Sequence, residues 1–150
     1  EVQGRRAIVL SLLTAFVRRR KHWERRSRLF QAGLYRSGDG GATWTRVFSP
    51  TDTTSGIGWL AQSLAISPDF LRDRLVFAGF VGSQNFRRSA DGGATWHPSD
   101  SGLPQGLIWG SAIALSPNWT RERLIFLVSR NIRKHGIYRR NTRLNLFLPK

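Results

Sequence analysis

Acidic side chains are the groups through which this sequence could act chemically on a substrate, and nine occur among its 150 residues. Hydrolysis of a glycosidic bond needs two carboxyl groups flanking that bond, about 5–9 Å apart. Five of the nine lie in repeated stretches, where a scaffold role is expected: Asp39, Asp69, Asp73, Asp91 and Glu122. Asp52 and Asp100 each follow a repeated stretch, so we name them as candidate residues of ligand-facing loops.

Other kinds of site lack the residues that they need. The chain has no Cys, which excludes disulfides and thiolate metal sites. Its three His residues show no metal-ligand spacing. The sequence contains neither a Gly-x-Ser-x-Gly nucleophile turn nor the Gly-Lys-Ser/Thr end of a phosphate loop. We therefore predict no metal, no cofactor and no catalytic residue in this chain.

Asp39 and Asp91 lie in an octapeptide that occurs twice in the sequence. Residues 37–44 read SGDGGATW, and residues 89–96 read SADGGATW, 52 positions later. Glycines after an Asp permit the positive φ of a tight hairpin turn, and the Asp carboxylate can accept backbone N–H bonds inside it. The residues predicted to build these structural turns are Ser37, Asp39, Gly41, Thr43 and Trp44, then Ser89, Asp91, Gly93, Thr95 and Trp96.

Asp69, Asp73 and Glu122 lie in a second repeated element. Residues 64–77 match residues 113–126 at an offset of 49. Each copy has an apolar strand, a Ser-Pro break, an aromatic residue, an Arg-acid-Arg triplet and a second apolar strand. The two elements alternate along the chain, which predicts four-stranded antiparallel units of about 50 residues.

The pattern Ser-x-Asp-x-Gly-x-Thr-Trp resembles the Asp-box, or bacterial neuraminidase (BNR) repeat, and both copies match at every defined position. The resemblance implies a β-propeller, with each box at the turn between the third and fourth strands of a blade. Relatives include sialidases, xyloglucan hydrolases, photosystem II assembly factor-like propellers and extracytoplasmic binding proteins, so no single activity is implied. The resemblance alone favours an extracytoplasmic or secreted location. The arginine triad and Tyr–Glu pair of a sialidase cannot be placed residue by residue here.

We expect an all-β fold of about two and a half four-stranded antiparallel blades of a β-propeller, as an open fragment over residues 29–140. A third box is missing, because residues 141–147 read NTRLNLF where Asp-Gly-Gly is expected. Closed propellers have about four to eight blades, and open ones expose strand edges. The predicted partners are therefore the remaining blades of a larger propeller or copies of this chain. One hypothesis for the abrupt ends is a gene fragment with shifted reading frames.

The two flanks differ from the repeats in charge. Of the net charge of +15, residues 1–28 contribute +7, residues 29–128 +1 and residues 129–150 +7. The apolar run at residues 7–17 is too short to span a membrane, and the basic cluster behind it does not fit a signal peptide. We interpret residues 1–28 as a basic non-propeller tail in which a helix could form, and residues 141–150 as a basic, apolar tail.

These observations favour a non-catalytic binding or scaffolding segment of an Asp-box propeller protein, with a glycan or protein ligand. The first alternative is a fragment of a propeller glycoside hydrolase, of sialidase or xyloglucanase type, with its catalytic residues outside this chain. The second is a basic binder of nucleic acid or a membrane surface that acts through the flanks. Neither nucleic acid nor membrane is our predicted partner, because the charge lies outside the repeats.

Overall fold

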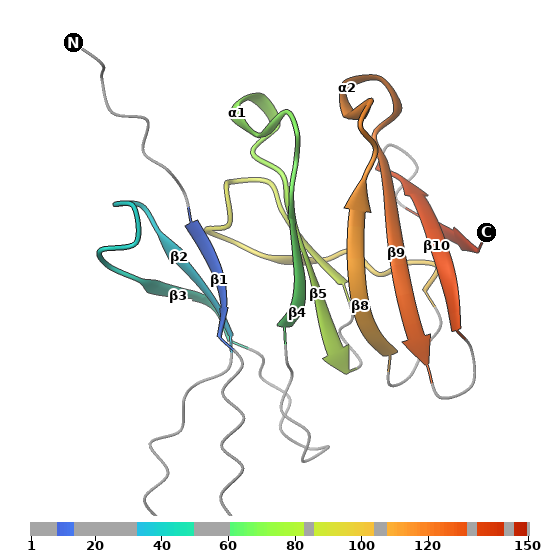
Figure 1. The fold of residues 1–150 in the computed structure, drawn as a ribbon, viewed down its shortest axis with the longest axis horizontal. Coiled ribbons are helices and arrows are strands. Elements are labelled where there is room, and N and C mark those ends of the chain that lie inside the picture. Colours follow the sequence, from blue (N-terminus) through green and yellow to red (C-terminus); the bar gives the residue numbers. More distant parts are fainter. Residues whose placement is uncertain are drawn as a thin grey trace, which may run out of the picture.

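The computed structural model describes residues 9–13, 33–49, 61–82, 86–103, 108–131, 135–142 and 146–149. In this part the chain forms a three-stranded antiparallel sheet and an eight-stranded one, and the larger sheet consists of two four-stranded units. We call these three units blades, and they stand side by side (Figure 1). The first blade contains β1 (Val9–Leu13), β2 (Gly33–Ser37) and β3 (Thr45–Phe48). The second contains β4 (Ala61–Ile66), β5 (Val76–Gly82), β6 (Phe86–Ser89) and β7 (His97–Pro98). The third contains β8 (Ile108–Leu115), β9 (Leu124–Asn131), β10 (His135–Asn141) and β11 (Leu146–Pro149).

The second and third blades are built alike, as the repeats predicted. In each, a short helix joins the first strand to the second: α1 (Phe70–Asp73) in one and α2 (Trp119–Glu122) in the other. Ile66 pairs with Val76 in the second blade, and Leu115 pairs with Ile125 at the same repeat position in the third. The prediction of antiparallel four-stranded units is confirmed. At one end of the two blades, β5 also pairs with β8.

The blades extend further along the chain than the sequence suggested. Strand β1 lies inside the predicted basic tail, and β11 lies inside residues 141–150. Val9 pairs with Ser37 as Val76 pairs with Ser89, so β1 occupies the second-strand position of the first blade. The five described residues of the N-terminal tail thus form a strand rather than a helix, because β2 offers them a free edge for pairing. The rest of residues 1–28 lies outside the described part of the chain.

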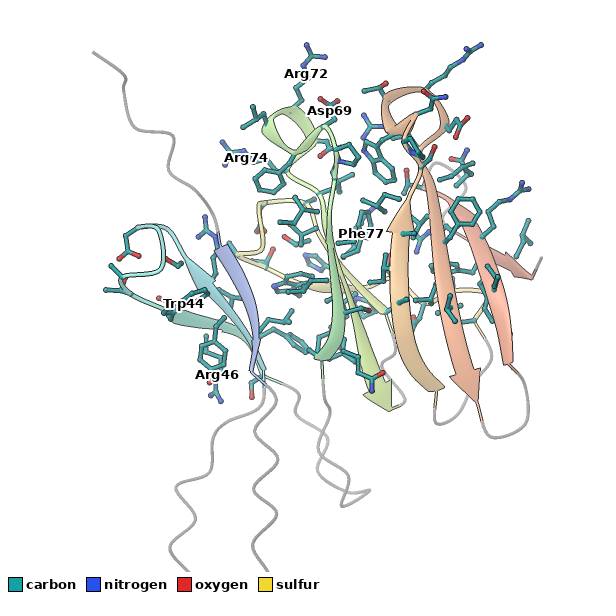
Figure 2. All side chains as sticks on the ribbon, viewed as in Figure 1. Trp44, Arg46, Asp69, Arg72, Arg74 and Phe77 are labelled. Atoms are coloured by element: carbon teal, nitrogen blue, oxygen red, sulfur yellow. The ribbon has the colours of Figure 1, made fainter. Side chains whose placement is uncertain are left out.

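Apolar residues fill both gaps between blades. In β5, the side chains of Val76, Ala78 and Phe80 alternate with Phe77, as a strand buried on both faces requires. The first-interface cluster, between blades one and two, contains Leu34, Ala61, Val76, Ala78, Phe80 and Trp96. The second-interface cluster, between blades two and three, contains Phe77, Phe86, Leu103, Trp119, Ile125, Leu127, Tyr138 and Phe147. Figure 2 shows Phe77 on the side of β5 that faces the third blade.

Candidate functional site

Both octapeptides form the hairpin turn between the last two strands of their blades. The turn at residues 37–44 joins β2 to β3, and the turn at residues 89–96 joins β6 to β7. Gly40 and Gly41 have φ of 73° and 98°, and Gly92 and Gly93 have φ of 76° and 88°. A side chain with a Cβ is strained in this region, so the paired glycines are what lets the chain reverse here.

Each octapeptide Asp is held by its own turn. The Asp91 carboxylate accepts hydrogen bonds from the Ser89 hydroxyl at 2.7 Å, the Ala94 amide at 2.9 Å and the Thr95 hydroxyl at 2.5 Å. The Thr95 amide also donates to it, at 2.9 Å. In the first turn the hydroxyls of Ser37 and Thr43 donate to the Asp39 carboxylate at the same distances as in the second turn, 2.7 and 2.5 Å.

These hydrogen bonds lower the pKa of both carboxyl groups. Donation from the Thr43 hydroxyl and amide, and then from Ser37, lowers the pKa of Asp39 far below its usual range. Burial alone would raise the pKa of Asp91, but the donors on Thr95, Ser89 and Ala94 outweigh burial and lower it far below its usual range. Both groups are therefore anions at neutral pH and poor proton donors.

The two octapeptide tryptophans differ in burial. The indole N–H of Trp96 donates to the Gly93 carbonyl at 3.1 Å, and that of Trp44 donates to the Gly41 carbonyl at 3.0 Å. Trp96 belongs to the first-interface cluster and is 8% exposed, whereas Trp44 is 41% exposed. Trp44 lies on the β2–β3 hairpin, at the end of the molecule away from the third blade (Figure 2). The turn geometry is the same, so the neighbouring blade decides whether the ring is buried.

The third blade has a different turn at the box position. Arg140 stands where the other two blades have the octapeptide Ser, and it is fully buried. Its guanidinium donates to the carbonyl and hydroxyl oxygens of Ser99 in the second blade. Burial, and then the nearby Arg88, lower the pKa of Arg140 to about 10. Phe147 stands at the Trp position and is also buried, so β10 and β11 keep the hairpin without the box residues.

A polar link between the second and third blades joins their two Ser-Pro elements. The Asp73 carboxylate accepts hydrogen bonds from the Ser67 hydroxyl at 2.7 Å, the Trp119 indole N–H at 2.8 Å and the Arg123 guanidinium at 2.5 Å. Asp69 lies 3.8 Å from the same guanidinium. Figure 2 shows Asp69 at α1, next to the third blade's α2. Burial would raise the pKa of Asp73, but the amide of Leu75 and these donors together lower it.

The sequence did not indicate this link. The repeat placed Arg123 beside Glu122, and the simplest pairing was between neighbours in the chain. In the structure Arg123 pairs with Asp73, 50 residues earlier, while Glu122 accepts a hydrogen bond from the Ser116 hydroxyl. The sequence shows only that Asp73 and Glu122 occupy the same position of the repeat, which does not reveal a contact between blades.

Of the two candidate ligand-facing acids, Asp100 lies in the described part of the chain. Asp52 lies outside the described residues. Asp100 follows β7 and is partly exposed, and its carbonyl accepts the Leu103 amide at 2.9 Å. Its charge raises the pKa of Arg87 and Arg140, which burial lowers more strongly. Asp100 is therefore placed beside buried arginines of the two blades.

The described ranges show neither a metal site nor a membrane-spanning helix. No group of three or more His, Asp or Glu side chains there has the arrangement of a metal site. None of the helices in those ranges has the length and apolar character needed to cross a membrane.

Comparison with known proteins supports the architecture. No protein-family model matches the chain, and no curated protein sequence matches it. Among solved structures, the chain is similar to a GH74 enzyme from Niastella koreensis, with a TM-score of 0.59 and 19% sequence identity over 79% of this chain. The chain spans 18% of the length of that enzyme. At this identity the likeness concerns the fold alone, and together with the antiparallel blades it shows an all-β, propeller-like fold without a closed barrel among the described residues.

Proposed function

We propose that this chain is a non-catalytic segment of an Asp-box β-propeller, which holds its blades in register and binds a glycan or protein ligand through the loops between strands. The observation that carries the proposal is the use of Asp39 and Asp91 by their own turns. Among the described residues, every donor that reaches these carboxylates comes from the same octapeptide. We therefore assign both octapeptides as structural Asp-boxes.

Three further described acids also have structural partners. Asp73 is held by three side-chain donors, Asp69 lies near two arginines, and Glu122 accepts the Ser116 hydroxyl. A general acid for glycoside hydrolysis needs a raised pKa near the working pH, but the pKa is lowered at Asp39, Asp73 and Asp91. These carboxyls suit a scaffold better than proton transfer.

The test compares the loss of fold with the loss of function. Asp91→Ala should lower the free energy of unfolding by about 1–3 kcal/mol, because the amide and hydroxyl donors of the turn lose a charged acceptor. Urea denaturation followed by tryptophan fluorescence measures this change. Leu71→Ala is the control, since the Leu71 side chain is 90% exposed and lies outside both octapeptides. An Asp91→Ala chain with unchanged stability that had lost glycan or peptide binding would contradict the structural assignment.

A second candidate function is a piece of a glycoside hydrolase. The fold similarity to a GH74 enzyme favours it, because GH74 enzymes are glycoside hydrolases with β-propeller folds. In that case the carboxyl pair would be completed by residues beyond this chain, with Asp52 or Asp100 as the contribution from this chain. Incubation with xyloglucan and with sialyl-oligosaccharides, followed by a reducing-end or free-sialate assay, distinguishes the two. Binding without product supports the scaffold, and product that disappears in Asp100→Asn or Asp52→Asn supports the hydrolase.

A further inference from the structure

One pair of positions recurs at both interfaces between blades. The first position is three residues before the octapeptide Ser or its replacement, and the second is seven residues after it. Between blades two and three, Phe86 and Phe147 hold these positions, and their rings meet edge to face at 5.1 Å. Between blades one and two, Leu34 and Trp96 hold them and share one cluster. In both cases the later blade inserts its aromatic ring against the earlier blade.

The same two positions are exposed at the two ends of the molecule. Ile137 of β10 is equivalent to Leu34 and Phe86, which are both 0% exposed, yet Ile137 is 50% exposed. Trp44 is equivalent to Trp96 and is 41% exposed. Each end thus carries one half of a contact that the chain already makes twice internally. The three blades stand in a row, so these halves lie at opposite ends (Figure 1).

Ile137 belongs to a wider apolar face on the third blade. It pairs with Val128 of β9, and both side chains are exposed. Leu148 of β11 pairs with Arg139 of β10 and is also exposed. We call Val128, Ile137 and Leu148 the open face. In the second blade the corresponding face carries Phe77 and Phe86, which the third blade covers completely.

We propose that the open face of one chain binds the Trp44 end of a second copy, head to tail. This contact would continue the two internal interfaces, because there an aromatic residue just after a turn covers the position of Ile137, and Trp44 is such a residue. The interface is heterologous, so it either closes into a ring or continues as a filament. Two copies provide six blades, within the range of closed propellers, and closure covers the exposed apolar side chains at both ends. The expected species is therefore a closed dimer with two identical interfaces.

Charge determines the conditions of the experiment. The net charge of +15 makes two copies repel each other, and salt screens this repulsion while leaving apolar contacts intact. Sedimentation velocity of the full 150-residue chain at several concentrations, in 0.1 M and about 0.5 M salt, measures the association. We expect a monomer–dimer equilibrium whose Kd falls as salt rises.

Two charge-introducing variants make the test specific for the proposed contact. Trp44→Lys and Ile137→Glu should each raise the dimer Kd about tenfold or more, because each buries an uncompensated charge at both interfaces of the dimer. An equimolar mixture of the two variants should regain the dimer. In the mixed dimer, one interface pairs the introduced lysine with the introduced glutamate, and the other is unchanged from the native one. Leu71→Glu is the matched control, since Leu71 lies in α1, is 90% exposed and is remote from both faces.

Circular dichroism of each variant as a monomer establishes that the variants fold. A dimer that both variants weaken, that their mixture restores and that Leu71→Glu leaves unchanged supports the proposal. The proposal is overturned by a monomer at all concentrations, by a ladder of larger open oligomers, or by a dimer whose Kd neither variant changes. These outcomes concern self-association only, so they are separate from the presence or absence of ligand binding in the proposed function.

Discussion

Trp96 and Trp44 occupy the same position of one repeated octapeptide, and their different surroundings make them a natural comparison. Both rings have the same hydrogen bond to a glycine carbonyl, but only Trp96 is packed between two blades. Trp96→Ala should lower the free energy of unfolding by about 3–5 kcal/mol, the usual cost of emptying a buried aromatic site. Trp44→Ala should cost clearly less in a monomer. Urea denaturation at a concentration low enough to prevent association measures both, and equal costs would contradict the assigned burial.

The loss of stability at acid pH also depends on single residues. The pKa values of Asp39, Asp73 and Asp91 are all lowered in the folded chain. In the unfolded chain these carboxyls take up protons near pH 4, whereas in the folded chain they do so only at lower pH. The stabilisation is therefore present above about pH 4 and is lost as the pH falls below it. Melting temperatures between pH 7 and pH 2 measure this loss. Asp91→Asn should flatten the decline, and an unchanged decline would show that Asp91 does not contribute.

At the level of residues, the octapeptide allowed a detailed prediction because its partners are close in the chain. Ser89, Asp91 and Thr95 lie within six positions of one another, so their roles in the turn follow from local geometry. Arg140 could not be predicted in this way. Its partner is Ser99 in the preceding blade, 41 residues earlier, and only the packing of two blades brings them together. Asp52 stays a prediction, because it lies outside the described residues.

At the level of elements, the link between the α1 and α2 regions holds two blades in register. Trp119→Phe removes the N–H that donates to Asp73 and keeps an aromatic ring, which is what the second blade has at the equivalent Phe70. A double-mutant cycle with Asp73→Asn should give a coupling free energy of about 1–2 kcal/mol, since the hydrogen bond involves a charged acceptor. Chemical denaturation of the four chains provides the cycle. Trp119→Phe with Leu71→Ala is the control pair, because Leu71 is exposed, and its coupling should be near zero. A coupling near zero for the first pair would mean that the link does not join the blades energetically.

The elements themselves could be predicted where they are repeated. The Ser-Pro element and the octapeptide together indicated the strands of the second blade, and the structure has them there. Strands β1 and β11 were not predicted, because their basic surroundings differ from the repeats and β11 follows a turn without the box residues. Strand β1 pairs with β2 and β11 pairs with β10, and these pairings form only when the chain folds. Composition describes a segment alone, while a strand also depends on the edge beside it.

At the level of the whole molecule, each blade is buried by its neighbours, so stability should depend on the number of interfaces. The second blade is covered on both faces, and the first and third blades each leave one apolar position of the repeated contact exposed. For this chain, we propose that a second copy supplies the further interfaces.

If two copies close head to tail, the melting temperature should depend on protein concentration, because association stabilises the folded chain by mass action. For a dimer of 150-residue chains we expect a rise of about 2 °C for each tenfold increase in concentration. Differential scanning calorimetry from about 5 to 500 μM in 0.5 M salt measures this slope, and the salt lowers the repulsion between the basic chains. Trp44→Lys should abolish the dependence, and its mixture with Ile137→Glu should restore it. A melting temperature that is independent of concentration in the native chain would mean that the two exposed ends do not bind each other.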